Sequence, residues 1–71
     1  MQDELKKLLL SINLGESLMQ IVDSYYYVIY RKAGDIYQID RTGDGWKTGN
    51  ISINNLGYNN FKDLVNNLNF E

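Results

Sequence analysis

The chain has 71 residues, a formal net charge of −2, and neither cysteine nor histidine. This length predicts one domain with a small hydrophobic core, and the two missing residue types exclude disulfides, structural zinc and catalytic systems built on Ser-His or Cys-His pairs. The acidic balance also argues against a dedicated nucleic-acid-binding domain, which is usually basic.

Residues 2–12 are predicted to form a helix that is apolar along one side. Its stripe follows the i, i+3, i+4, i+7 spacing and consists of Leu5, Leu8, Leu9 and Ile12. Asn13 and Gly15 tolerate left-handed backbone angles, so we expect the helix to end there. Residues 16–24 suit a short helix or a strand, and we favour a strand that leads into the next element.

Residues 25–41 hold five of the six tyrosines and are predicted to form a β-hairpin. Aromatic and β-branched residues at 25–32 favour one strand, and residues 36–41 form the returning strand. We expect the link around Gly34 to supply the positive φ that a tight hairpin needs.

A second turn and a third strand follow the hairpin. Gly43 and Gly45 predict the turn. The alternation of residues 50–54 predicts a strand with Ile51 and Ile53 on its buried face.

The last predicted element is a helix over about residues 60–68. Its apolar stripe consists of Phe61, Leu64, Val65 and Leu68. Asn59 or Asn60 is expected to cap its N-terminus, with Asp63 in the first turn. We expect Phe70 to fold back onto the core.

These elements predict a single α+β domain over residues 1–71, with the order helix, three or four antiparallel strands, helix. Each helix has one apolar stripe and therefore needs one surface to pack against. We expect both helices on one face of the sheet, which leaves the other face uncovered.

An uncovered sheet face that carries tyrosines is the main candidate for a binding surface, because tyrosine offers a large contact area at a low entropic cost. In the first strand of the hairpin, Tyr25 and Tyr27 share one face and Tyr26 and Tyr30 the other. We expect Tyr25 and Tyr27 to be the uncovered pair; the alternative is that both faces are ordinary half-buried sheet. The candidate partner-binding residues are Tyr25, Tyr27, Arg31, Lys32, Tyr37, Arg41, Trp46 and Lys47.

Basic side chains near these tyrosines raise a second hypothesis, a single-stranded nucleic-acid binder that stacks bases and holds phosphates. The residues concerned are Arg31, Lys32, Arg41 and Lys47. Acidic side chains in the same region, Asp35, Asp40 and Asp44, cancel much of their field. Solvent-exposed cross-strand ion pairs are therefore the simpler interpretation.

The remaining motifs predict no specific chemistry. Residues 40–45 resemble the start of a calcium-binding EF-hand loop, but Ile51 stands where the bidentate glutamate belongs. Trp46 could anchor a partner, although we expect it to close one end of the core. We therefore predict no catalytic residue, no cofactor and no metal site.

The leading hypothesis is a cytoplasmic, non-enzymatic protein-binding module, in the form of a small phage or mobile-element inhibitor of a host defence protein. The frequent Asn, Ile, Tyr and Lys are typical of chains encoded by AT-rich DNA, including that of many phages. The size and element order resemble those of some anti-CRISPR proteins, which implies the same kind of inhibitory role.

Three further points limit or extend this hypothesis. Residues 25–40 resemble the sheet of HicB-type antitoxins, without the later strand-and-turn signature of that family, so no residue roles follow from the resemblance. Self-association through an exposed sheet edge, giving a homodimer, is a third alternative. The longest apolar run, residues 8–10, is too short to span a membrane.

Overall fold

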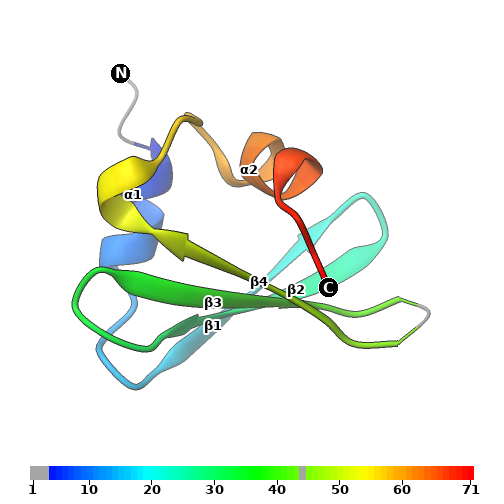
Figure 1. Ribbon diagram of the computed structural model, residues 1–71, viewed down its shortest axis with the longest axis horizontal. Coiled ribbons are helices and arrows are strands. Elements are labelled where there is room, and N and C mark those ends of the chain that lie inside the picture. The colour runs from blue at the N-terminus through cyan, green and yellow to red at the C-terminus, as the bar shows by residue number, and fades with distance from the viewer. Residues whose placement is uncertain (1–3, 44) are drawn as a thin grey trace.

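The computed structural model describes residues 4–43 and 45–71 and shows an α+β fold (Figure 1). In chain order the elements are α1 (Glu4–Leu10), β1 (Ser17–Val22), β2 (Tyr25–Arg31), β3 (Ile36–Arg41), β4 (Lys47–Ser52), the 3-10 helix η1 (Ile53–Asn55) and α2 (Phe61–Asn67). The four strands form one antiparallel sheet in the order β1-β2-β3-β4, and both α-helices lie on one face of it. The predicted class, element order and helix placement are confirmed, with four strands.

Residues 16–24, which suit a helix or a strand by sequence, contain strand β1. The backbone conformation at each end of β1 explains why the strand forms. Asp23 and Ser24 have positive φ angles of 51° and 78°, as in the two-residue turns that match the twist of a hairpin, and they join Val22 directly to Tyr25. At the other end, Gly15 has a φ of 82°. The Gly15 N–H donates to the Arg31 carbonyl and the Arg31 N–H donates to the Glu16 carbonyl, so two residues oppose one in a glycine-type β-bulge.

The turn between β2 and β3 forms differently from the prediction. The positive-φ glycines in the described residues are Gly15 and Gly45, so the expectation for Gly34 is wrong. Instead, the Arg31 side chain closes the loop, because its Nε and Nη2 donate to the Gly34 carbonyl at 3.3 and 2.8 Å. The N–H groups of Lys32 and Ala33 both donate to the Ile36 carbonyl.

Strand β4 begins three residues before the predicted strand 50–54 and ends at Ser52. Ile53 belongs to η1, where the Ser52 hydroxyl accepts a hydrogen bond from the Asn54 N–H and caps the turn. Ile53 is buried as expected, and Ile51 is half-buried. Residues 2 and 3 of the predicted first helix and Asp44 of the predicted turn lie outside the described residues.

The core fills the space between the sheet and the two helices. Its buried side chains are Leu5, Leu9, Ile12, Tyr27, Ile29, Tyr37, Ile39, Ile53, Phe61, Leu64 and Val65. The predicted cap of α2 is confirmed, since Asn60 Oδ1 accepts a hydrogen bond from the Asp63 N–H at 2.9 Å. The Tyr37 hydroxyl donates to the Leu9 carbonyl at 2.9 Å, and this bond ties the end of α1 to the sheet.

The two edges of the sheet differ. Phe70 packs on the core as predicted, with its ring 5.9 Å from that of Tyr27. The next residue, Glu71, exchanges two backbone hydrogen bonds of 3.0 Å with Thr48 and so covers part of the β4 edge. Nothing in residues 4–43 and 45–71 pairs with the outer edge of β1.

No helix in the described part of the chain has the length and apolarity to cross a membrane.

Candidate functional site: the uncovered face of the sheet

The register of the strands decides which tyrosines the helices cover. Ile29 lies opposite Ile39 and Arg31 lies opposite Tyr37, and these residues share their face with Tyr27. Tyr27 is 3% exposed and Tyr37 is 0% exposed. The expectation that Tyr27 is uncovered, and the inclusion of Tyr37 in a surface site, are therefore wrong.

Tyr25 lies at the open end of the helix-covered face. Its side chain is 41% exposed, and its ring stands edge-on to that of Tyr27 at 6.4 Å. The tyrosines of the uncovered face are Tyr26 and Tyr30, on the side of β2 opposite to the predicted pair.

The uncovered face has an apolar half, made by the side chains of β1 and β2 that point away from the helices. It consists of Met19, Ile21, Tyr26, Val28 and Tyr30. Met19 lies opposite Val28 and Ile21 lies opposite Tyr26, so the apolar side chains form adjacent rows. Met19 is 55% exposed and Ile21 60%, which is high for side chains of this type and is typical of surfaces that bind a partner.

The other half of this face, on β3 and β4, is mainly polar, apart from Ile36 at the start of β3. Lys32 Nζ donates to Gln38 Oε1 at 3.1 Å, and Gln38 Nε2 donates to Asp40 Oδ1 at 3.0 Å. Thr48 Oγ1 donates to the same Asp40 oxygen at 2.9 Å. A shallow hollow of about 430 Å³ borders this network and includes Tyr30. The uncovered face therefore combines an apolar area with fixed hydrogen-bonding groups.

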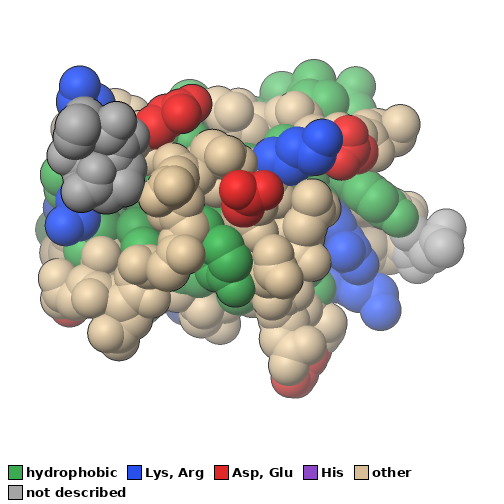
Figure 2. Space-filling model, turned by 90° about the horizontal axis from the view of Figure 1, so that it is seen from above, with side chains coloured by type: hydrophobic (Ala, Val, Ile, Leu, Met, Phe, Trp, Pro, Cys, Tyr) green, Lys and Arg blue, Asp and Glu red, His purple; other side chains and the backbone are tan. Residues whose placement is uncertain are grey.

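The helix side has a different surface. Seen from above in Figure 2, it is mostly polar, with acidic and basic side chains interspersed among small green areas.

Most of the predicted basic residues do not join the uncovered tyrosines. Arg41 is on the helix-covered face, with its Cζ atom 5.0 Å from the Tyr25 ring centre and 4.8 Å from that of Phe70. Arg31 Nη1 donates to the Ile12 carbonyl at 2.9 Å. Of the four basic candidates, Lys32 borders the uncovered face through its hydrogen bond to Gln38. Lys47 lies opposite Arg41 in the β3–β4 register, at the far end of the sheet.

Burial changes the ionisation of the two core tyrosines. Burial raises the pKa of Tyr27 above the ordinary 10.0, and the charge of Arg41 partly opposes this. Burial also raises the pKa of Tyr37, against a smaller opposite effect of Arg31. Both phenols therefore stay protonated at neutral pH and act as packing groups.

Trp46 lies in the loop before β4 and is 66% exposed. The expectation that it closes one end of the core is therefore wrong. Its exposure keeps it a candidate contact residue, at the far end of the sheet from Tyr30.

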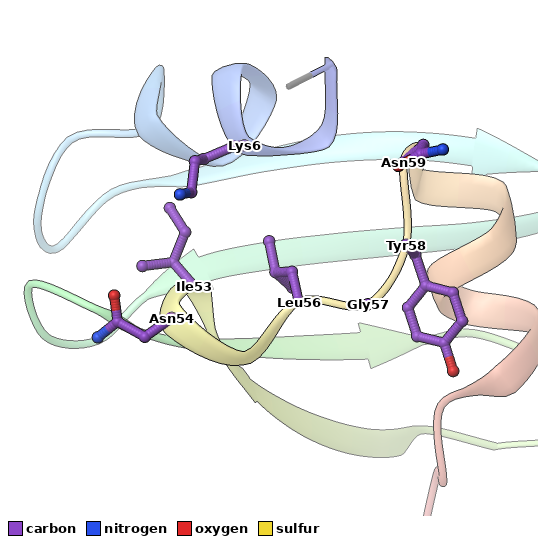
Figure 3. Close-up of a pocket in the computed structure, with 7 residues that line it drawn as sticks. All are labelled: Lys6, Ile53, Asn54, Leu56, Gly57, Tyr58 and Asn59. Carbon is purple, nitrogen blue, oxygen red and sulfur yellow. The ribbon is translucent and has the colours of Figure 1, made fainter. Parts of the chain in front are cut away.

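A hollow lies between α1 and the η1–α2 link (Figure 3). Its volume is about 380 Å³, and Lys6 is its one charged lining residue among those described. Leu56 and Ile53 extend into it, whereas the Tyr58 ring points away. Among the described residues, Lys6 is therefore the one titratable side chain that faces this hollow, whereas acid–base catalysis uses a positioned pair. Residues 4–43 and 45–71 contain no cluster of three or more acidic, histidine or cysteine side chains for a metal ion.

Met19 and Ile21 were missed as candidate site residues. Their alternation with Leu18, Gln20 and Val22 was the available signal, but it identifies an exposed apolar row only once the segment is known to be a strand.

Comparison of the chain with models of protein families, with curated proteins and with solved structures gave no match.

Proposed function

We propose that this protein is a non-enzymatic protein-binding module whose binding surface is the uncovered face of its sheet. The observation that carries the proposal is the pair of exposed apolar rows on β1 and β2, which neither helix covers. An exposed apolar area bordered by polar groups is typical of protein interfaces.

The composition of this face describes its partner. The apolar half matches a protein surface with exposed aliphatic or aromatic side chains. In the polar half, two donors of the sheet, Gln38 and Thr48, already hold one oxygen of the Asp40 carboxylate. A partner should therefore offer hydrogen-bond donors opposite this carboxylate. The inhibitor role towards a host defence protein, carried by a phage or mobile element in the cytoplasm, is the biological setting we propose, on the basis of size, composition and the lack of cysteine.

Affinity capture with the intact chain, followed by quantitative binding to the captured partner, tests this proposal. Tyr30→Lys should weaken binding at least about tenfold, because it places an ammonium group in the contact area. Tyr58→Lys is the matched control: Tyr30 is 38% exposed and Tyr58 37%, but Tyr58 lies in the η1–α2 link, away from the uncovered face. Equal loss in both variants, or none in Tyr30→Lys, would overturn the proposal.

The nucleic-acid hypothesis has less support. Stacking on Tyr26 and Tyr30 needs several cations beside them, whereas Arg31 and Arg41 lie on the opposite face and Lys32, which borders this face through Gln38, shares its network with the acidic Asp40. We expect flat fluorescence titrations with short single-stranded oligonucleotides at low salt. A saturable, salt-dependent signal would favour nucleic acid instead.

A further inference from the structure

We propose that the outer edge of β1 binds the same edge of a second copy of this chain, which gives a two-fold dimer with one continuous eight-stranded sheet. This inference does not rest on the proposed function, because the edge and the uncovered face present different groups. The edge presents backbone N–H and C=O groups, whereas the face presents side chains.

The hydrogen-bonding pattern shows which groups the edge offers. Backbone bonds alternate along an antiparallel ladder, and Arg31 bonds with Glu16 at the start of β1. Every second residue from Glu16 therefore bonds with β2. Ser17, Met19 and Ile21 direct their N–H and C=O groups to the free edge, where nothing in the described residues pairs with them.

The sequence of β1 lacks the features that normally protect an edge strand. Such strands usually carry charge, proline, a central bulge or a covering segment. The segment Ser17–Val22 is SLMQIV, which contains no charged residue and no proline, and its bulge precedes the strand. By contrast, Glu71 pairs with Thr48 at the β4 edge.

Self-pairing of β1 has one favoured register. The two pleats match only if residues on the same face lie opposite each other. Centring the two-fold axis on Gln20 places Met19 opposite the partner's Ile21 and Leu18 opposite the partner's Val22. Apolar side chains then meet on both faces.

Charge and hydrogen bonding also favour this register. The acidic residues beside the strand, Glu16 and Asp23, fall opposite the partner's Ser24 and Ser17, so no like charges meet. The two Gln20 amides lie across the axis, where each both donates and accepts. Shifting the axis to Met19 would instead place Ile21 opposite the partner's Ser17 and Leu18 opposite the partner's Gln20.

A charge-swap experiment tests the dimer. Sedimentation of the wild-type chain from about 1 µM to about 1 mM should show a monomer–dimer equilibrium. Gln20→Lys and Gln20→Glu should each weaken dimerisation at least tenfold, because like charges directly opposite on antiparallel strands repel. An equimolar mixture of the two variants should form a heterodimer, which a misfolded variant could not do.

Cysteine cross-linking tests the register, with no background because the natural chain has no cysteine. Opposite residues at a non-hydrogen-bonded position lie about 4.5 Å apart between Cα atoms, within disulfide reach. Gln20→Cys should therefore oxidise to a covalent dimer, whereas Asn50→Cys on β4 should not. A wild-type chain that stays monomeric up to about 1 mM, or a Gln20→Lys variant that dimerises normally, would overturn the proposal.

Discussion

The two faces of one sheet carry the same residue type in opposite settings. On the helix-covered face, Tyr27 packs its ring 5.5 Å from that of Phe61, and the Tyr37 hydroxyl bonds with α1. On the uncovered face, Tyr26 and Tyr30 are 48% and 38% exposed. The register between β2 and β3 therefore determines the setting of each tyrosine. Tyr27 and Tyr37 stabilise the fold, whereas Tyr26 and Tyr30 remain accessible to a partner.

The largest difference between the faces should come from deleting a ring on each. Tyr27→Ala should lower the free energy of unfolding by about 3–5 kcal/mol, because it leaves a cavity between Phe61 and Phe70. Tyr26→Ala on the same strand should cost less than about 1 kcal/mol. Chemical denaturation followed by circular dichroism measures both values. Similar losses in the two variants would contradict the assignment of the faces.

A methyl group added under the C-terminal segment should have the next largest effect. A Cβ atom at Gly49 would lie 2.7 Å from Leu68 Cδ2 and 3.3 Å from the Asn69 carbonyl oxygen. Gly49→Ala should therefore destabilise the fold by about 1–3 kcal/mol. Gly57→Ala, which meets nothing within 4 Å, is the control. Thermal unfolding of the two variants decides, and an unchanged melting temperature in Gly49→Ala would mean that the segment does not pack on β4.

A smaller effect is expected from removing the Tyr37 hydroxyl. Tyr37→Phe loses the bond to the Leu9 carbonyl, which still accepts from the Ile12 N–H, so the cost should be about 0.5–1.5 kcal/mol. Tyr30→Phe on the uncovered face should change the stability by less than about 0.5 kcal/mol. Equilibrium unfolding at neutral pH compares the pair directly.

Alkaline pH should lower the stability of the fold through its two buried tyrosines, Tyr27 and Tyr37. The pKa values of Tyr27 and Tyr37 are raised above the ordinary 10.0 in the folded state, so the unfolded chain releases these protons first. Their contribution to stability is complete below pH 10 and falls as pH rises through the folded-state pKa values. Tyr37→Phe should therefore lose less stability than the wild-type chain as the pH rises above about 10. An identical pH dependence in Tyr37→Phe and the wild-type chain would argue against burial as the cause.

The smallest effect is expected at Trp46. This side chain is apolar but 66% exposed beyond the end of the sheet, so Trp46→Ala should change the free energy of unfolding by no more than about 0.5 kcal/mol. A larger loss, measured by chemical denaturation, would restore the role at the end of the core that the sequence suggested.

The sequence predicted the elements well because their patterns are local. The stripes of the two helices, the Asn60 cap and the tyrosine-rich hairpin all appear where expected. The turn at Asp23 and Ser24 was not recognised, because neither residue is glycine although both have positive φ. This turn makes residues 17–22 a strand.

The face of the hairpin was predicted wrongly because β2 is apolar on both sides. The missing information was in β3, where Tyr37 and Ile39 alternate with the polar Gln38 and Asp40. Pairing Ile39 with Ile29 then places Tyr27 on the buried face, but this pairing depends on a register that the sequence alone did not fix. Trp46 was misplaced for a related reason, since a residue type alone does not reveal burial.

The pairing of Glu71 with Thr48 limits how far association through sheet edges could extend. A molecule whose second edge is partly covered pairs most readily through its open edge, and the resulting pair offers a third copy only the uncovered part of β4. A molecule with two open edges would add copies head to tail without closure and grow into a filament. Two backbone hydrogen bonds at the end of the β4 edge would thus hinder polymerisation, and they would favour a discrete assembly even with an unprotected strand such as β1.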